Sequence, residues 1–322
     1  MKQNMFMNFT TQIPIAKSQQ PITYASKIIS LGSCFAENMG AKFEYFKFQN
    51  STNPFGIIFN PVSIERLIYR AVHKIEFTKK DIFFHNEHWH CYEVHSELSN
   101  TSPELLLENL NKLLHHFRSE LTEATHIILT YGTSWVYRLK TTKEVVANCH
   151  KVPQNQFEKE ILSVEVLQKS IQNSINLIQE VNPNCNFIFT VSPVRHIKDG
   201  FVENQRSKAH LITAIHKIVN YQLSIINYFP SYEIMMDELR DYRFYAEDML
   251  HPSQIAIDYI WIQFFENYIS ENEFATMQQV CDIQKALHHK PFNPLSESHQ
   301  KFLTNLNKKI ERLQQKLPFV SF

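Results

Sequence analysis

The sequence predicts an α/β fold in which helices cover both faces of a parallel β-sheet. Short apolar runs of strand length recur along the chain, and three of them, 27–31, 126–131 and 186–191, are apolar at nearly every position. Such runs are typical of strands buried on both faces. Longer amphipathic segments lie between them, and this alternation favours a parallel sheet whose functional loops follow the carboxyl ends of the strands.

Five strands are expected in chain order, at 27–31, 45–49, 126–131, 186–191 and 232–236. Between them, leucine and phenylalanine recur at helical spacing in the segment 104–121. Isoleucine, valine and leucine do the same in the segment 206–228. A single apolar stripe of this kind predicts a helix that packs against the sheet.

Two regions fall outside this alternation. Residues 77–103 alternate in polarity like a β-hairpin, and we interpret them as an insertion over one edge of the sheet. Residues 273–322 look helical, and the last helix carries an apolar stripe of Phe302, Leu306, Ile310, Leu313 and Leu317. This stripe packs on its own domain or on a partner subunit of a homo-oligomer. We therefore expect an α/β domain over 1–272 and a helical extension over 273–322.

The composition argues against several classes of protein. Lys and Arg number 32, as do Asp and Glu, so the net charge is zero and no general attraction to nucleic acid or anionic membranes is expected. No apolar run reaches the roughly 20 residues that cross a bilayer, and the N-terminus lacks the apolar core of a secretory signal. The five cysteines are scattered without a C-x-x-C pair, which is typical of reduced thiols. We expect a cytoplasmic protein.

Glycines and one serine mark a candidate site. Of only five glycines, Gly32, Gly56 and Gly132 follow or closely trail expected strands, where glycine permits tight turns and close backbone approach. In a parallel sheet these turns share one edge. Ser33 would lie there at the start of a helix, where backbone amides and the helix dipole favour negative charge. Ser33 is therefore either a nucleophile or only the cap of its helix, a position that serine also favours.

A base for Ser33 is expected in the segment 245–261. Asp248 and His251 are separated by two residues there, and Pro252 and an amphipathic helix follow. In a D-x-x-H turn the carboxylate folds back on the imidazole, holds the Nδ1 proton and leaves Nε2 free to accept a proton from a hydroxyl group. The spacing is common by chance, but its place after the last expected strand favours a catalytic pair.

Six motifs occur in the order LGSCFAENMG, NPFGIIFNP, TYGTSWVY, VANCHKVP, TVSPVRHIKDGFVENQRSKAHL and EDMLHPS. Together they resemble the GSCFA family, a group of largely uncharacterised bacterial proteins related to SGNH (GDSL-type) hydrolases. The resemblance covers roughly residues 20–265. It implies a flavodoxin-like three-layer α/β/α sandwich, and a serine esterase or acyl-transfer site that needs no cofactor.

The resemblance also implies roles for individual residues. Ser33 would be the nucleophile, and its backbone amide would contribute to the oxyanion hole together with the amide of Gly56. Asp248 would orient His251, the general base. The third sequence block departs from the SGNH pattern, because Ser134 stands where G-x-N-D places the asparagine that donates to the oxyanion.

That departure leaves the third oxyanion donor open. Loss of one such donor lowers the rate by about 10²–10³. Ser134 or Thr133 replaces the asparagine, or a group from another loop does, and the candidates from other loops are Asn148, His150 and Asn53. The sequence does not choose among them.

Further residues are candidates for contact with substrate. Arg195 and His196 follow the fourth expected strand and suit a carboxylate or phosphate. Arg195 is equally well explained by an ion pair with Asp199 or Glu203. Trp135 would form an apolar wall for an acyl or sugar group, unless it belongs to the core as most buried aromatic residues do.

The expected hairpin is rich in histidine, with His85, His88, His90 and His95 within eleven residues. Two histidines on one strand face could hold zinc or another transition metal. Alternatively, the hairpin is a lid whose His95 and Trp89 line the pocket, or it has no functional role.

The leading hypothesis is an SGNH-like serine hydrolase acting on an ester or acyl group of a small molecule, such as an O-acetylated sugar. Two other classes remain open. One is a binding module that keeps the crevice without turnover, and the other is a metal-binding protein that uses the histidines at 85–95.

Overall fold

The computed structural model describes residues 11–219 and 225–322, and its centre is a five-stranded parallel sheet. The strands are β1 (Lys27–Gly32), β2 (Gln49–Thr52), β5 (His126–Tyr131), β9 (Asn186–Val191) and β10 (Ile226–Phe229). They lie in the order β10-β9-β5-β1-β2. If these five strands are numbered 1 to 5 along the chain and the sheet is read from the β2 edge, the order is 2-1-3-4-5. This is the order of a flavodoxin-like doubly wound sheet, whose direction of winding reverses between β1 and β5.

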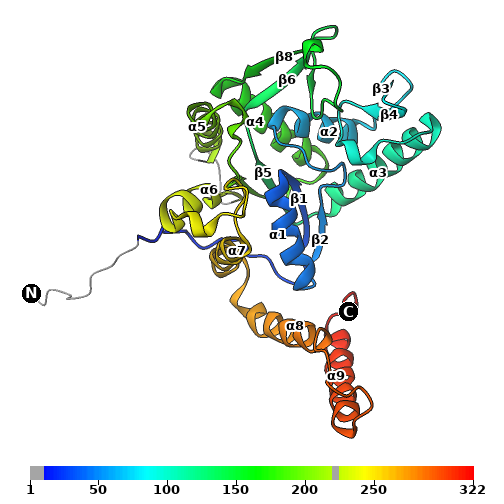
Figure 1. Ribbon diagram of the computed structural model, residues 1–322, viewed down its shortest axis with the longest axis vertical. Coiled ribbons are helices and arrows are strands. Elements are labelled where there is room, and N and C mark those ends of the chain that lie inside the picture. Colours follow the sequence, from blue (N-terminus) through cyan, green and yellow to red (C-terminus); the bar gives the residue numbers. More distant parts are fainter. Residues whose placement is uncertain (1–10, 220–224) are drawn as a thin grey trace, which may run out of the picture.

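Helices cover both faces of this sheet (Figure 1). The first helical layer contains α2 (Pro61–His73), α3 (Pro103–Glu123), α4 (Val164–Val181) and α5 (Phe201–Val219). The second layer contains α1 (Cys34–Tyr45) and α7 (Gln254–Tyr268). The predicted fold class, a three-layer α/β/α arrangement with a parallel sheet, is confirmed.

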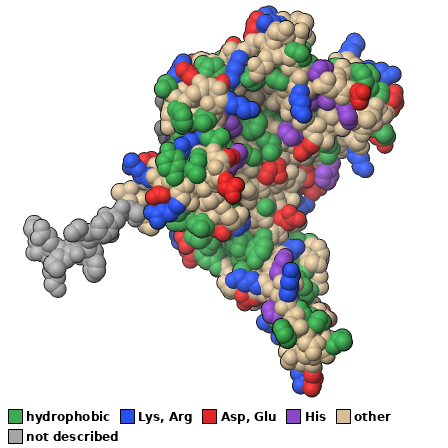
Figure 2. Space-filling view, viewed as in Figure 1, with side chains coloured by type: hydrophobic (Ala, Val, Ile, Leu, Met, Phe, Trp, Pro, Cys, Tyr) green, Lys and Arg blue, Asp and Glu red, His purple; other side chains and the backbone are tan. Residues whose placement is uncertain are grey.

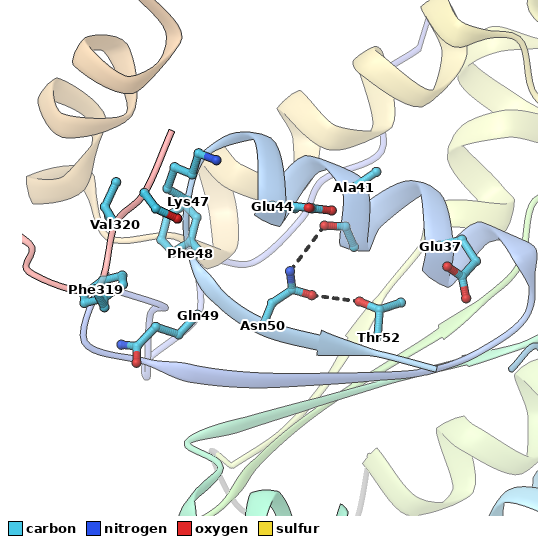
Figure 3. A pocket seen from close by; sticks show the side chains of 12 residues that line it. Glu37, Ala41, Glu44, Lys47, Phe48, Gln49, Asn50, Thr52, Phe319 and Val320 are labelled. Carbon is cyan, nitrogen blue, oxygen red and sulfur yellow. Dashed lines mark hydrogen bonds between the residues drawn. The ribbon is translucent and has the colours of Figure 1, made fainter. Parts of the chain in front are cut away.

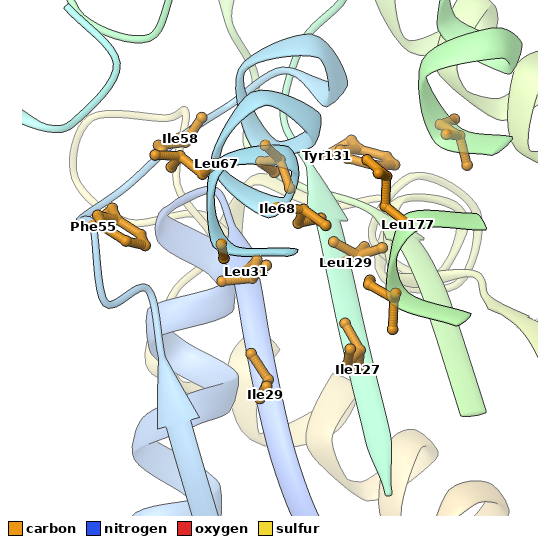
Figure 4. Packing of buried hydrophobic residues seen from close by; sticks show 14 of the residues in the cluster. Ile29, Leu31, Phe55, Ile58, Leu67, Ile68, Ile127, Leu129, Tyr131 and Leu177 are labelled. Atoms are coloured by element: carbon orange, nitrogen blue, oxygen red, sulfur yellow. The ribbon is translucent and has the colours of Figure 1, made fainter. Parts of the chain in front are cut away.

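Alternating side chains of each central strand supply the two cores. Ile127 and Leu129 of β5 pack with the first helical layer, as Figure 4 shows, whereas Ile128 packs with the second. In β1, Ile29 faces the first layer and Ile28 the second. Every residue of β5 is buried, which explains the continuous apolar runs, since full burial of one such side chain contributes about 1.5–3 kcal/mol.

Three of the five predicted strands are confirmed, and two are wrong. Residues 45–49 were expected to form a strand, but α1 continues to Tyr45 and β2 begins only at Gln49. The sequence of β2 is polar, because it lies at the edge of the sheet.

The fifth strand also lies elsewhere. Residues 232–236 form parts of α6 (Ser231–Glu233) and of the π-helical turn Ile234–Leu239. Strand β10 instead occupies 226–229, and the predicted helix over 206–228 overlaps its first three residues. Residues 220–224 of that prediction lie outside the described residues. An edge strand of four residues is too short to show a distinct pattern.

Two small sheets complete the fold. The expected hairpin within 77–103 is present as β3 (Ile82–His85) and β4 (His88–Cys91). The intervening Asn86 and Glu87 both have positive φ, as a tight two-residue hairpin turn requires. A three-stranded antiparallel sheet of β6 (Trp135–Leu139), β7 (Val145–Val146) and β8 (Phe157–Ile161) was not predicted.

The C-terminal region forms two helices, α8 (Phe274–Leu287) and α9 (Glu297–Lys316), which extend away from the main body in Figure 1. Leu306, Leu313 and Leu317 are buried in one cluster with Met277 of α8, whereas Phe302 is 36% exposed. The Gln284 side chain donates to the backbone oxygen of Tyr45 at 3.1 Å. Most of the α9 stripe therefore packs within its own chain.

None of the described helices is long and apolar enough to cross a membrane. The N-terminal segment on which the prediction about a secretory signal rests begins in residues 1–10, which lie outside the described part of the chain.

Candidate active site

The crevice expected between β1 and β5 brings the ends of these strands together. Gly32, the last residue of β1, pairs with Thr130 of β5. The backbone amide of Ser33 then donates to the Thr130 oxygen at 3.0 Å, and α1 begins at the next residue. The ends of the two strands thus fix the start of α1 at the point where the sheet changes its direction of winding.

Ser33 is the N-cap of α1. Its hydroxyl oxygen accepts a hydrogen bond from the Phe35 amide at 3.3 Å, and its exposed fraction is 0%. Ser33 therefore caps α1, and its role as a nucleophile remains a prediction. No hydrogen bond joins Ser33 to His251 among the described residues, so the pairing of these two groups remains a prediction.

Cys34, the first residue of α1, is partly exposed, in contrast to Ser33. Burial raises the pKa of its thiol, and the nearby charge of Lys208 acts in the opposite direction. The backbone amides of Cys34 and Phe35 also lower this pKa. A thiol therefore lies at the amino end of α1, one residue beyond the predicted nucleophile.

Asp248 and His251 form the expected turn. One carboxylate oxygen of Asp248 lies 2.5 Å from Nδ1 of His251, and the other accepts from the backbone amides of Leu250 at 2.9 Å and His251 at 3.0 Å. Hydrogen bonds from the amide and ring of His251 and from the Leu250 amide lower the pKa of Asp248 to about 2. Both side chains are nearly half exposed, and Nε2 of the imidazole has no hydrogen-bond partner among the described residues.

This pair is attached to the end of β9. The backbone amide of Arg195 donates to the Leu250 oxygen at 3.1 Å. The pKa of His196 is lowered to about 3. Burial is the largest cause, and the charges of Lys208 and then His251 act in the same direction. His251 thus lies near the carboxyl end of the sheet, with His196 and Lys208 nearby.

Lys208 was not predicted as a site residue from the sequence. It belongs to α5, is 1% exposed, and its Nζ donates to the backbone oxygens of Gly132 and Ser192, both at 2.7 Å. Burial lowers its pKa to about 7. A signal was present, because Lys208 occupies the apolar stripe of α5 together with Leu211 and Ile215.

The amides expected at the oxyanion hole already donate within the fold. The Ser33 amide binds Thr130, and the Gly56 amide donates to the Asn53 oxygen at 2.7 Å. The Ser134 amide donates to the Ser207 hydroxyl at 2.8 Å. In this conformation all three amides donate within the fold, and the oxyanion roles of Ser33, Gly56 and Ser134 remain predictions.

The other oxyanion candidates lie in two places. Asn53 is buried, directly follows β2, and accepts from the Gly32 amide at 2.7 Å. Asn148 accepts from the backbone amide of His150 at 2.8 Å, and His150 binds the Cys91 oxygen of the hairpin at 2.7 Å. Asn53 therefore supports the turn after β1, whereas Asn148 and His150 pack against the hairpin.

Thr133 and Trp135 take part in the contact between the β5 end and α5. The Thr133 hydroxyl lies 2.9 Å from that of Ser207 and accepts from the Trp135 amide at 3.0 Å. The Trp135 ring nitrogen donates to the backbone oxygen of Glu203 at 3.4 Å. These contacts give both residues a structural role in this conformation.

Arg195 has neither of the acidic partners considered for it. Asp199 pairs with Lys159, and Glu203 pairs with Arg206. The Arg195 guanidinium instead lies 4.0 Å from the ring centre of Tyr245 and 5.6 Å from that of Tyr242. It therefore retains its charge without a carboxylate among the described residues.

The histidine-rich hairpin does not present a metal site. Both ring nitrogens of His90 are engaged, with the Ser99 hydroxyl at 2.6 Å and the His85 backbone oxygen at 2.9 Å. Within 11–219 and 225–322, no three His, Cys, Asp or Glu side chains are arranged to hold a metal ion. Histidine side chains gather over this side of the molecule in Figure 2, but they do not converge on one point.

His95 connects the hairpin region to the crevice. Its backbone amide donates to the Phe55 oxygen at 3.0 Å. A Cβ atom at Gly56 would lie 2.3 Å from the His95 Cβ, so glycine is needed for this close contact. The structure therefore places His95 beside Gly56, a predicted crevice residue.

A separate groove of about 680 Å³ lies between α1, β2 and the C-terminal tail. Figure 3 shows Glu37 and Glu44 of α1, Asn50 of β2, and Phe319 and Val320 of the tail around it. The pair of Asp248 and His251 does not line this groove.

The fold and site define a doubly wound α/β protein with a histidine–carboxylate pair near the carboxyl end of its sheet. The model of the GSCFA family matches residues 27–264, and that of the GSCFA domain protein, C-terminal domain, matches residues 280–322. The chain belongs to the GSCFA family. No curated protein matches it.

Proposed function

We propose that this protein is an acyl hydrolase or acyl transferase in which His251 is the general base and Asp248 orients it. The contact of 2.5 Å between Nδ1 of His251 and the Asp248 carboxylate carries the proposal. A carboxylate held by two backbone amides fixes the imidazole and leaves Nε2 available for proton transfer. The relation to SGNH hydrolases that the sequence suggests supports the same class of reaction.

The nucleophile belongs to the first residues of α1. The sequence favours Ser33, whereas exposure favours Cys34, because Ser33 is fully buried and residue Cys34 is partly exposed. In the reaction, the nucleophile loses its proton to a base and attacks the acyl carbonyl carbon. The displaced alcohol takes up that proton, and His251 then removes a proton from the water that releases the acyl group.

The substrate class is a small molecule with an ester or acyl group, and an O-acetylated sugar is one example. Arg195 supports substrates that also carry a carboxylate or phosphate, since its guanidinium has no carboxylate partner among the described residues. The cytoplasmic location, the absence of nucleic-acid partners and a homo-oligomer through α9 remain predictions from the sequence.

Hydrolysis of p-nitrophenyl acetate by the full chain tests the reaction. We expect His251→Ala to lower kcat/KM by about 10²–10⁴. His115→Ala is a matched control, because His115 is also exposed and lies 3.0 Å from a carboxylate, that of Glu76. Equal activity in His251→Ala and the wild type, with both proteins folded, would contradict the proposal.

The nucleophile is identified by peptide mapping of the acylated protein, and by labelling with a fluorophosphonate for serine or iodoacetamide for cysteine. A folded protein that neither hydrolyses the ester nor reacts with either reagent at α1 would instead be a binding module. Elemental analysis of the purified protein tests the metal-binding alternative.

A further inference from the structure

The helices α8 and α9 form an arm, residues 274–322, that extends away from the central sheet (Figure 1). The turn between them, residues 288–296, lies at the end of this arm. There Phe292 is fully exposed and Leu295 is 88% exposed, more than any other large apolar residue in the described part of the chain. Single exposed apolar residues are ordinary on protein surfaces, but two large ones at the end of a projection are suited to contact with an apolar medium.

Hydrogen bonds hold this turn in one shape. The side-chain oxygen of Asn293 accepts from the Leu295 amide at 3.0 Å. The backbone oxygen of Asn293 accepts from the amide of Ser296 at 3.2 Å and from its hydroxyl at 2.9 Å. Phe292 and Leu295 therefore protrude from a turn that is already fixed, so little conformational entropy is lost when their side chains are buried against another surface.

The backbone of this turn has few free hydrogen-bond donors. Pro291 and Pro294 have no N–H group, and the amides of Leu295 and Ser296 already donate within the turn. The side chain of Gln300 in turn donates to the Pro294 backbone oxygen at 3.1 Å. Backbone polar groups without a partner are costly in the apolar part of a membrane, so a turn of this composition suits insertion into a lipid surface.

The arm is positively charged, although the chain as a whole is neutral. Residues 274–322 contain seven Lys and Arg but only three Asp and Glu, whereas the whole chain contains 32 of each. Lys285, Lys290 and Lys301 lie within or beside the turn, and Glu297, which pairs with Lys301 at 2.6 Å, is the only acidic residue from 285 to 301. Figure 2 shows Lys, Arg and histidine side chains on the arm together with apolar ones. The arm therefore complements a negatively charged surface.

We propose that the arm binds the surface of an anionic lipid bilayer, with Phe292 and Leu295 inserted among the lipids and the nearby lysines at the phosphate headgroups. Protruding apolar side chains can enter a fluid surface without a matching groove, whereas a protein partner would have to provide one. Binding through two apolar residues and a few lysines is weak and reversible. The proposal does not depend on the acyl-transfer function. It replaces, for the arm alone, the expectation of no attraction to anionic membranes, which followed from the net charge.

Co-sedimentation of the full chain with lipid vesicles tests the proposal. One set of vesicles contains phosphatidylcholine mixed with anionic phosphatidylglycerol, and the other contains phosphatidylcholine alone. We expect the protein to bind the mixed vesicles more tightly, and to dissociate as the salt concentration rises, because salt screens the attraction between lysines and headgroups. No binding to the mixed vesicles at low salt overturns the proposal.

The double variant Phe292→Ser, Leu295→Ser removes the apolar side chains of the turn. Both residues are exposed, so the variant should fold, and its affinity for the mixed vesicles should fall by at least about 10-fold. Phe201→Ser, Val202→Ser is the matched control, because these residues of α5 are 65% and 71% exposed on the main body, and its affinity should not change. Equal affinity in the wild type and the arm variant refutes the proposal, as does an equal loss in both variants.

A tryptophan at the turn reports whether it enters the lipid. In Phe292→Trp we expect the added fluorescence to shift to shorter wavelengths with the mixed vesicles and to be quenched by brominated lipid. Phe201→Trp, on the main body, should show neither effect. Vesicle binding without either effect at position 292 would mean adhesion by charge alone, and would contradict insertion.

Sedimentation velocity without vesicles separates a lipid surface from a second copy of the chain. We expect Phe292→Ser, Leu295→Ser to leave the association state of the protein unchanged at every concentration. Association that increases with concentration, is abolished by this double variant and is not accompanied by vesicle binding would assign the turn to an interface between copies, and the lipid proposal would then be wrong.

Discussion

The side-chain oxygen of Asn53 accepts a hydrogen bond from the backbone amide of Gly32 at 2.7 Å. This contact joins the residue after β2 to the last residue of β1, directly before Ser33. The Asn53 amide nitrogen also donates to the Glu37 carboxylate of α1 at 2.5 Å. One buried asparagine therefore braces the strand end and the first turn of the helix that carries the candidate nucleophiles.

Asn53→Asp should destabilise the protein at pH 7, by about 1–3 kcal/mol, because a carboxylate would face that of Glu37. Repulsion between the two carboxylates raises their pKa in the folded state, so acidification toward pH 4 should restore part of the loss. Chemical denaturation at both pH values measures this. Adding Glu37→Gln should restore stability at pH 7, and no recovery in that double variant would contradict the assignment.

Gly32→Ala should be strongly destabilising. A Cβ atom at Gly32 would lie 2.0 Å from the Thr130 backbone oxygen, and its φ of +142° is one that other residues rarely adopt. We expect a loss of about 2–5 kcal/mol in the free energy of unfolding. Gly200→Ala is the control, since its φ is +104° but no atom lies within 4 Å of the added Cβ. Equal losses in the two variants would refute the steric explanation.

Ser134→Ala tests whether this serine stabilises the fold or an oxyanion. Its amide and hydroxyl both bind Ser207, so we expect a loss of about 1–3 kcal/mol in stability with little change in kcat. Ser207→Ala should cost a similar amount, and the two losses should not add. A fall in kcat of about 10²–10³ without loss of stability would instead assign Ser134 to the oxyanion hole.

His150 should make the protein sensitive to acid. Burial lowers its pKa from 6.5 to about 4, so the unfolded chain binds a proton below pH 6.5 that the folded chain does not. The contribution of neutral His150 to the free energy of unfolding is therefore fully present above pH 6.5. It is lost as the pH falls toward 4, by about 3 kcal/mol in total. Chemical denaturation measures the free energy of unfolding from pH 7 to 4, and this free energy should fall less steeply in His150→Asn than in the wild type. In His115→Asn, at an exposed site, it should fall as steeply as in the wild type.

The apolar stripe of α9 should contribute to the stability of a single chain. Leu306 is 4% exposed and Phe302 is 36% exposed, so Leu306→Ala should cost about 2–4 kcal/mol and Phe302→Ala much less. Denaturation at several protein concentrations separates packing within the chain from association. A midpoint that rises with concentration, and is abolished by Phe302→Ala, would instead favour the homo-oligomer.

The central strands β1, β5 and β9 could be predicted because burial on both faces demands continuous apolar sequence. Strands β2 and β10 could not. Both lie at the edges of the sheet, where one side of the strand is unpaired and the pattern of side chains is less constrained. The turn that holds Asp248 and His251 was predictable for a different reason, because it depends on residues only three positions apart.

The sequence by itself determined the doubly wound architecture, the position of Ser33 directly after β1, and the local pair of Asp248 and His251. Only the tertiary structure decided that Ser33 is buried as a cap, that the expected oxyanion amides are already bonded, and that Lys208 is buried against the backbone oxygens of Gly132 and Ser192. Periodicity and short spacing are local properties of the chain. Burial, and the contacts of a side chain with distant strands, are set only when the layers pack.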